Sequence, residues 1–112
     1  MSTIYVIGIG YKALDNRARE IILASEIILA SKRLFEVFKG YAEYKSVKDK
    51  VKAINNVDET MKFIHSSLVT HHSSLPIVLL ASGDPEFFGI GKRAVMEFGK
   101  EMVEIFPDLS SI

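Results

Sequence analysis

The segment PIVLLASGDPEFFGIG (Pro76–Gly91) carries the strongest local signals in the chain. Its apolar run, Ile77–Ala81, predicts a buried strand. Asp84 and Pro85 are preferred residues at a helix N-cap and at the first helical position, so a helix is expected next. Gly83 is not explained by capping, and a glycine there indicates a positive φ angle or a group packed close to the backbone. The segment therefore predicts a strand, a specialised loop and a helix.

The rest of the chain repeats this alternation of strands and helices. N-cap signals at Asp15 and at Asn56, the latter with Glu59 in a capping-box arrangement, predict two helix starts. A short helix is expected over Lys32–Phe38, and Gly99 is expected to end the last helix. Strands that alternate with helices form a parallel sheet with helices on both faces, so the predicted fold class is α/β. The strands are predicted at Thr3–Ile7, Ile27–Ala30, Tyr41–Ser46, Ile77–Ala81 and Glu101–Phe106.

The hexapeptide EIILAS occurs twice in tandem, at Glu20–Ser25 and Glu26–Ser31. The first copy continues an apolar helical stripe that begins at Leu14. A helix through both copies would carry that stripe around its whole circumference. The second copy is therefore predicted to form the buried strand Ile27–Ala30, so that identical residues adopt two structures in different surroundings.

Composition excludes several classes of protein. The 112 residues are enough for one domain, and the 48% apolar and 25% charged content is typical of a globular core and surface. Formal net charge is zero, so nothing indicates nucleic acid or an anionic membrane as a partner. The absence of cysteine excludes disulfides and permits a reducing compartment. The N-terminus has no signal-peptide pattern, and a cytoplasmic location is expected. The longest apolar stretch, Ile21–Ala30, contains Glu26 and falls short of the roughly 20 residues of a membrane helix.

Two glycine motifs resemble nucleotide loops without matching them. GIGYKA (Gly8–Ala13) fits the dinucleotide pattern G-x-G-x-x-G/A, but the second strand ends at Ser31, where that fold needs an acid for the ribose. GIGKR (Gly89–Arg93) fails the Walker A pattern, because Glu86 stands at the first glycine position and Arg93 replaces the Ser or Thr. Nicotinamide, flavin and P-loop interpretations are therefore disfavoured.

Neither a metal site nor a catalytic triad is apparent in the sequence. His65, His71 and His72 have no carboxylate at metal-ligand spacing and are expected to be solvated. In a parallel sheet, ligands bind beyond the carboxyl ends of the strands. Three such ends carry glycine or serine: GIGYKALD after the first strand, SGDPEFFGIG after the fourth and PDLSS after the fifth. These three loops predict the binding site.

Four segments together resemble the tetrapyrrole methylase family of S-adenosylmethionine-dependent methyltransferases. They are IYVIGIG at the start, ASEIILASKRLFEVF after the first helix, LLASGDPEFFGIG, and the closing IFPDLSSI. The GDP loop is the most specific of them. Its form here, ASGDPEFFGIG, is most similar to the cobalamin-pathway branch that methylates C5 of cobalt-precorrin-7, also described as precorrin-6Y methylase.

The resemblance implies two α/β domains, with the methyl donor S-adenosylmethionine in the cleft between them and the tetrapyrrole substrate in an open trough. The first domain has a five-stranded parallel sheet with helices on both faces. Residues 1–112 are expected to be this N-terminal domain, with the C-terminal domain absent and the isolated chain inactive. The motifs identify no catalytic residue, and no protein-bound metal is expected. Donor contacts carried over by motif position are Gly10, Tyr11, Ser82, Gly83, Asp84, Phe87, Ser110 and Ser111.

The chain departs from the family pattern after its first G-x-G, where many members have Pro-Gly and this chain has Tyr11-Lys12. The apolar face around Phe87 and Phe88 is expected to promote self-association. A partner that performs the companion C15 methylation and decarboxylation is a further expectation. The acceptor carries many carboxylates, and basic side chains near strand ends are candidates to meet them, with a solvated surface as the alternative. These side chains are Lys12, Lys32, Arg33, Lys92 and Arg93.

Two alternatives stay open at the level of sequence. One keeps the family and changes the acceptor to another corrin carbon, to uroporphyrinogen or to diphthamide. The other is a non-catalytic α/β module that binds a nucleotide or a protein partner. The reading frame beyond Ile112 distinguishes them, because a second α/β domain is expected only for the methylase.

Overall fold

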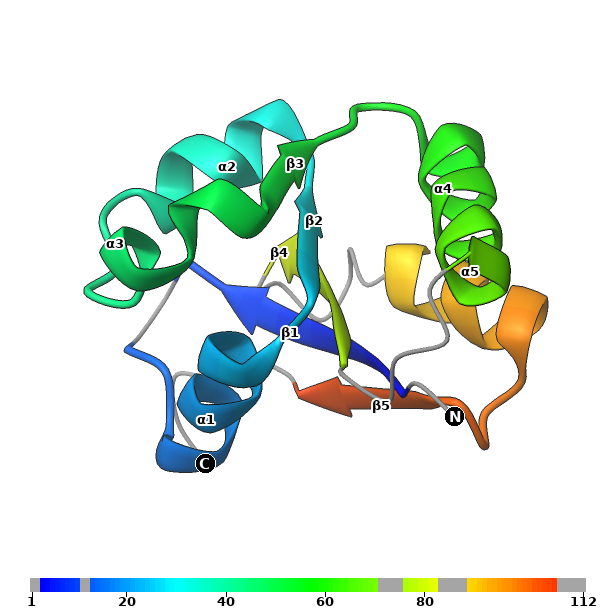
Figure 1. The fold of residues 1–112 in the computed structure, drawn as a ribbon, viewed down its shortest axis with the longest axis horizontal. Coiled ribbons are helices and arrows are strands. Elements are labelled where there is room, and N and C mark those ends of the chain that lie inside the picture. Colours follow the sequence, from blue (N-terminus) through cyan, green and yellow to red (C-terminus); the bar gives the residue numbers. More distant parts are fainter. Residues whose placement is uncertain (1–2, 11–12, 71–75, 83–88, 107–112) are drawn as a thin grey trace.

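The computed structural model describes residues 3–10, 13–70, 76–82 and 89–106, and these form an α/β fold around one parallel sheet (Figure 1). The sheet has five strands in the order β3-β2-β4-β1-β5, and all neighbouring strands run parallel. The strands are β1 (Ile4–Ile9), β2 (Ile27–Ala30), β3 (Val51–Ala53), β4 (Ile77–Ser82) and β5 (Val103–Phe106). The helices are α1 (Asn16–Ala24), α2 (Lys32–Phe38), α3 (Tyr44–Val47), α4 (Val57–Thr70) and α5 (Gly89–Phe98), with a 3-10 turn, η1 (Lys48–Lys50), before β3.

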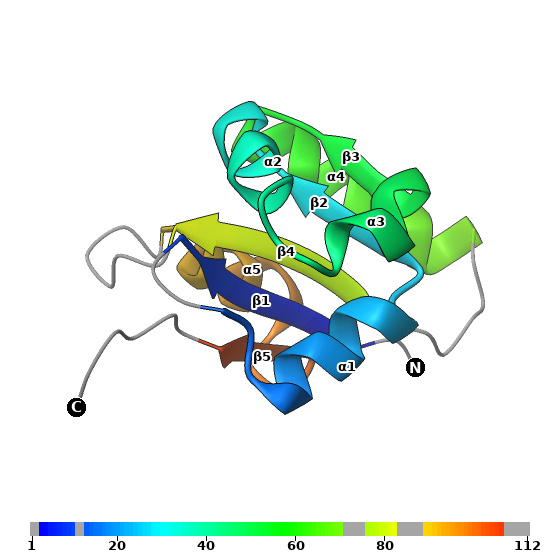
Figure 2. The same ribbon diagram turned by 90° about the vertical axis from the view of Figure 1, so that its left-hand side faces the viewer.

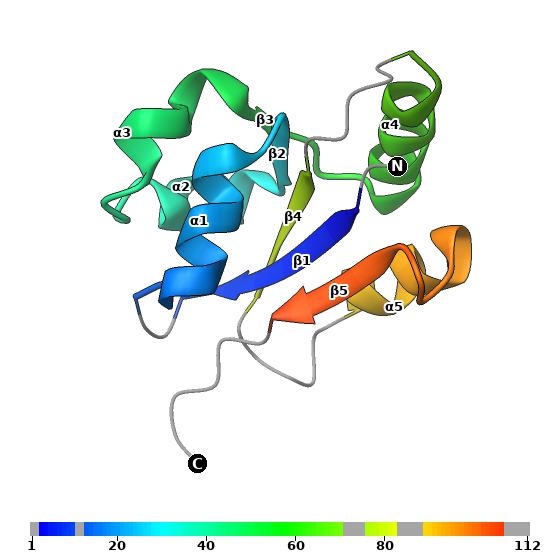
Figure 3. The same cartoon turned by 60° about the horizontal axis from the view of Figure 1, so that its bottom comes forward.

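Helices cover both faces of the sheet, which confirms the predicted fold class. Figure 3 shows α1, α2 and α3 on one side of the strands and α4 and α5 on the other. Alternation along β1 divides the core: Ile7 and Ile9 pack with α1 and α2, whereas Ile4 and Val6 pack with α4 and α5. Because every central strand is covered twice, its residues are apolar in both directions, as in the run Ile77–Ala81.

The tandem hexapeptides adopt two structures, as predicted. The first copy lies in α1 and the second forms β2. Their final serines have opposite roles. Ser25 is fully buried and its hydroxyl donates to the Ile22 carbonyl at 2.7 Å, at the end of α1. The hydroxyl of Ser31 instead accepts the N–H of Leu34 at 3.2 Å and caps the start of α2.

The predicted helix ends are confirmed at three positions. Asp15 caps α1, its Oδ1 accepting the N–H of Ala18 at 2.8 Å. Asn56 accepts the N–H of Glu59 at 3.1 Å at the start of α4, which is the Asn56 half of the expected capping box. Gly99 has φ +89°, and its N–H donates to the carbonyl of Val95 at 2.8 Å, an αL ending of α5.

The strand predicted at Tyr41–Ser46 is wrong. That segment leads into the single-turn helix α3, because a helical turn lets Tyr44 pack its ring against Phe38, 5.8 Å between centroids, and buries Val47 in the same core. The edge strand β3 comes later and has only three residues. The last strand also starts later than predicted, at Val103, since Met102 donates its N–H to Gly99 in a turn.

Candidate functional site

Three strand ends that were predicted to carry the site lie side by side in the sheet. β1 is flanked by β4 and β5. Ile9 pairs in register with Ser82 of β4, and Ile7 pairs with Phe106 of β5. Figure 2 shows the arrowheads of β1, β4 and β5 at the same edge of the sheet. The loops that follow these strands therefore leave from one contiguous edge, where ligands of open α/β sheets bind.

Gly10, the first residue after β1, has the backbone conformation that only glycine adopts readily. Its φ is +121°, and a Cβ added there would meet no atom within 4 Å. The glycine is therefore required by the backbone rather than by crowding. Its N–H donates to the hydroxyl of Tyr41 at 2.8 Å, so this N–H is already engaged within the protein. A ligand beside Gly10 would meet backbone without a side chain at that position.

The remaining predicted donor contacts divide into two groups. Ser82 is described as the last residue of β4, directly beside the end of β1. The others lie outside the described residues: Tyr11, Gly83, Asp84, Phe87, Ser110 and Ser111.

A cavity of about 390 Å³ opens at the carboxyl ends of β2, β3 and β4. Its walls are mainly apolar, and its polar members come from the starts of two helices and from the loop after β3. Sequence reasoning missed it, because the third strand was placed ten residues too early and the loop after the true β3 was not recognised as a strand end. The apolar lining is Leu29, Ala30, Leu34, Ile54, Val57, Leu80, Ala81 and Ile90, and the polar lining is Ser31, Arg33, Asn55 and Thr60.

Hydrogen bonds fix most of the polar lining. The Oδ1 atom of Asn55 accepts the backbone N–H of Lys32 at 2.7 Å, which ties the loop after β3 to the start of α2. Thr60 is buried, and its hydroxyl donates to the carbonyl of Asn56 at 2.9 Å. Arg33 is exposed at the same rim, and within the described ranges no ion pair uses its guanidinium. It is the cation of this cavity.

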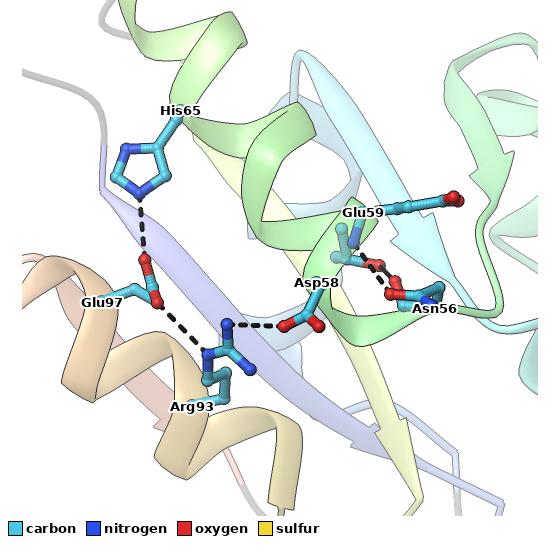
Figure 4. Close-up of polar contacts among 7 residues, drawn as sticks. Asn56, Asp58, Glu59, His65, Arg93 and Glu97 are labelled. Atoms are coloured by element: carbon cyan, nitrogen blue, oxygen red, sulfur yellow. Dashed lines mark hydrogen bonds and ion pairs between the residues drawn. The ribbon is translucent and has the colours of Figure 1, made fainter.

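Arg93, another candidate for substrate carboxylates, is held by acidic side chains instead (Figure 4). Its guanidinium lies 2.7 Å from Asp58 on α4 and 3.2 Å from Glu97 on α5. Hydrogen bonds that the guanidinium donates to Asp58 and then to Glu97 raise the pKa of Arg93. Glu97 also contacts Nε2 of His65 at 3.1 Å, so His65 is not simply solvated as expected. Hydrogen bonds from His65 and then from Arg93 lower the pKa of Glu97.

Within residues 3–10, 13–70, 76–82 and 89–106, the acidic and histidine side chains form no group of three or more that could hold a metal ion. Among the helices described, none combines the length and the hydropathy needed to cross a membrane.

Comparison with known proteins gives one family and two curated relatives. The profile of the family described as tetrapyrrole (corrin/porphyrin) methylases matches residues 3–112. Proteins of Salmonella typhimurium and Salmonella typhi, each named cobalt-precorrin-7 C(5)-methyltransferase, are 58% identical to the chain over 36 residues. That segment is 32% of this chain and 18% of each relative, so the chain is matched to a small part of their length. No solved structure matches the chain.

Proposed function

The chain belongs to the tetrapyrrole (corrin/porphyrin) methylase family, and we propose that it is part of an S-adenosylmethionine-dependent C-methyltransferase that methylates C5 of cobalt-precorrin-7 in cobalamin biosynthesis. The observation that carries the proposal is the family match over residues 3–112. The choice of C5 is supported by the 58% identity to proteins of that name, over a short segment. Both findings agree with the ASGDPEFFGIG form of the loop after β4.

We propose that residues 1–112 act as the N-terminal domain of a two-domain enzyme. The matched segment is only 18% of each relative, so those relatives contain much more chain than the comparison covers. In a cleft between two domains, this chain would contribute one wall of the donor site. Its isolated form is expected to bind the donor weakly and to transfer no methyl group.

The residues at the carboxyl edge of the sheet fit a bound donor. Gly10 leaves open space beside its backbone, and the ends of β4, β1 and β5 are neighbours. The proposed donor residues are Gly10, Tyr11, Ser82, Gly83, Asp84, Phe87, Ser110 and Ser111. When bound, S-adenosylmethionine supplies a methyl group attached to a positively charged sulfur.

The role of the protein in such a reaction is chiefly to position two ligands. In-line displacement needs the acceptor carbon, the methyl group and the sulfur in one line, and alignment of this kind accounts for much of the rate enhancement. The hydrogen bond from Gly10 to Tyr41, which holds the backbone at the end of β1, would serve this purpose. The acceptor carbon must also lose a proton, and we assign no residue of this chain as the base.

The test is a methyl-transfer assay with the complete reading frame that contains this chain. We expect transfer of radiolabel from methyl-labelled S-adenosylmethionine to cobalt-precorrin-7. Turnover of uroporphyrinogen III or a diphthamide precursor in its place would assign the protein to another branch, and no transfer to any of the three would contradict the proposal. Calorimetric titration of the 112-residue chain should show weak or undetectable binding of S-adenosylmethionine. Micromolar affinity would contradict the proposal that this chain forms only one wall of the donor site.

Three other properties remain proposals. They are a cytoplasmic location, self-association through the apolar cleft face, and cooperation with a partner that methylates C15 and decarboxylates the substrate. Light scattering over a concentration series of the chain checks the second of these directly.

A further inference from the structure

We propose that the cavity at the carboxyl ends of β2, β3 and β4 is the subsite for a carboxylate side chain of the methyl acceptor, with Arg33 as the charge partner. This inference rests on the proposed function, because it names the part of the same site that receives the acceptor. It is carried by the position of the cavity, by its lining and by the pairing of Arg93 with two acidic side chains.

The position follows from the directions in which the chain leaves the strands. After β2 the chain continues into α2 on one face of the sheet, and after β3 and β4 it continues into α4 and α5 on the other face. Strands whose exits diverge in this way leave a crevice between them, and crevices of this type bind ligands in open α/β sheets. The cavity occupies the crevice beside β2, β3 and β4.

A second pair of diverging exits adjoins the first across β4. The chain leaves β1 toward α1 on the first face, so the exits of β1 and β4 also diverge. Gly10 and Ser82, both proposed donor residues, lie at these two strand ends. The end of β4 therefore separates the donor residues from the cavity. Methyl transfer requires donor and acceptor in direct contact, and two subsites on either side of one strand end meet that requirement.

The lining matches the edge of a ring that carries an acidic side chain. Leu29, Leu80 and Ile90 supply apolar walls for the hydrocarbon part. At the rim, Asn55 uses its oxygen on the N–H of Lys32, which leaves its amide nitrogen as a hydrogen-bond donor. The Arg33 guanidinium adds a fork of N–H donors, which pairs with both oxygens of a carboxylate.

Size and charge restrict the occupant further. A volume of about 390 Å³ is near the lower end of ordinary ligand pockets, which span roughly 300–1,000 Å³. The cavity therefore takes one side chain and the adjoining ring edge, and the rest of a tetrapyrrole must lie outside it. Arg93 is occupied by Asp58 and Glu97, so it does not compete for the same carboxylate.

The experiment is a titration of the ¹⁵N-labelled 112-residue chain with cobyrinic acid, a corrin whose side chains end in carboxylates. We expect saturable shifts at the Asn55 side-chain amide and at the backbone amides of Thr60 and Ala81, with a dissociation constant of roughly 0.1–1 mM, the range for a few polar contacts. Cobinamide, in which amides replace the side-chain carboxylates, should bind at least about tenfold more weakly, because an amide cannot form the charged pair.

Two variants locate the contact. Arg33→Gln should weaken cobyrinic acid binding about tenfold while the spectrum keeps its dispersion, since this side chain is exposed. Lys100→Gln is the matched control, because it removes an exposed cation before β5, at the opposite edge of the sheet. Equal affinities for Arg33→Gln and the unaltered chain would overturn the assignment, and so would the absence of shifts at the cavity.

S-adenosylhomocysteine, which carries its own carboxylate, provides the competing outcome. If it shifts the cavity amides and cobyrinic acid does not, the cavity belongs to the donor and the inference fails. Failure of the proposed function is a separate result. Cobyrinic acid would then still bind in an Arg33-dependent manner, but the complete protein would methylate no tetrapyrrole. In an active complete protein, Arg33→Gln should raise KM for the acceptor and leave KM for the donor unchanged.

Discussion

The backbone N–H of Gly10 donates to the hydroxyl of Tyr41 across 2.8 Å, joining residues that are 31 positions apart in the chain. Tyr41 belongs to the turn after α2, and its ring lies 6.0 Å from that of Phe38, which is fully buried. The contact therefore anchors Gly10, at the end of β1, to the core beneath α2. The backbone of Gly10 is held by this hydrogen bond before any ligand arrives.

Tyr41→Phe should release this anchor while keeping the ring. We expect faster hydrogen exchange at the Gly10 amide and a loss of about 0.5–1.5 kcal/mol in the free energy of unfolding, nearer the lower value because the hydrogen bond is exposed. Tyr44→Phe is the control, because it keeps the ring contacts of Tyr44 with Phe35 and Phe38 and does not touch Gly10. Unchanged exchange at Gly10 in Tyr41→Phe would show that the loop is held by other contacts.

Gly10→Ala should destabilise the fold through backbone strain alone. The added Cβ finds open space, but φ of +121° is unfavourable for alanine and costs about 1–3 kcal/mol. Urea unfolding measures the difference. Gly40→Ala is the comparison: Gly40 has no positive φ, and a Cβ there would lie 3.4 Å from the Val37 carbonyl, so a smaller loss is expected. Equal losses for the two variants would contradict a conformational origin.

Asp15→Ala should weaken the start of α1. The Ala18 N–H loses its acceptor at 2.8 Å, and the expected loss is about 1 kcal/mol of unfolding free energy. Asp15→Asn keeps a side-chain oxygen in the same place and should retain most of the stability. Thermal unfolding of the three proteins tests this order, and an asparagine variant as unstable as the alanine variant would mean that the charge matters more than the cap.

Glu97→Gln should lower stability near neutral pH and have little effect in acid. The pKa of Glu97 is lowered in the folded chain by hydrogen bonds from His65 and Arg93. A carboxylate with a lowered pKa stabilises the fold above its ordinary pKa, and this contribution disappears as the pH falls through the lowered value. Urea unfolding of both proteins between about pH 7 and pH 3 should therefore show a difference that shrinks with acid. The contacts of Glu97 with His65 and Arg93 are exposed to solvent, so added salt should reduce the difference in stability at neutral pH.

Patterns of residues that are close in the sequence identified most of the helices and strands, but not which strands pair with each other. Strand β4, the cap at Asp15 and the change of structure between the two EIILAS copies depend on nearby residues, and they were predictable. Strand β3 was not, since Val51–Ala53 has one lysine among three residues and is a strand because it pairs with β2. The cavity was missed for the same reason.

The candidate site shows the same limit. Glycine and serine predicted which loops carry the site, but only the strand order shows that the ends of β4, β1 and β5 are adjacent. The engagement of Arg93 by Asp58 was also invisible in the sequence, because the two residues lie on different helices. Pairings between distant segments depend on the packing of the whole sheet.

The position of β4 in the sheet determines when the strands can pair during synthesis. β4 lies between β1 and β2, which do not pair with each other, so the first two strands to leave the ribosome have no common partner yet. The edges of β1 and β2 that face β4 stay open until residues 77–82 have been translated, and open edges of this kind invite pairing between nascent chains. A pause in translation before this segment should therefore raise the demand for chaperones, whereas a pause after it should have a smaller effect.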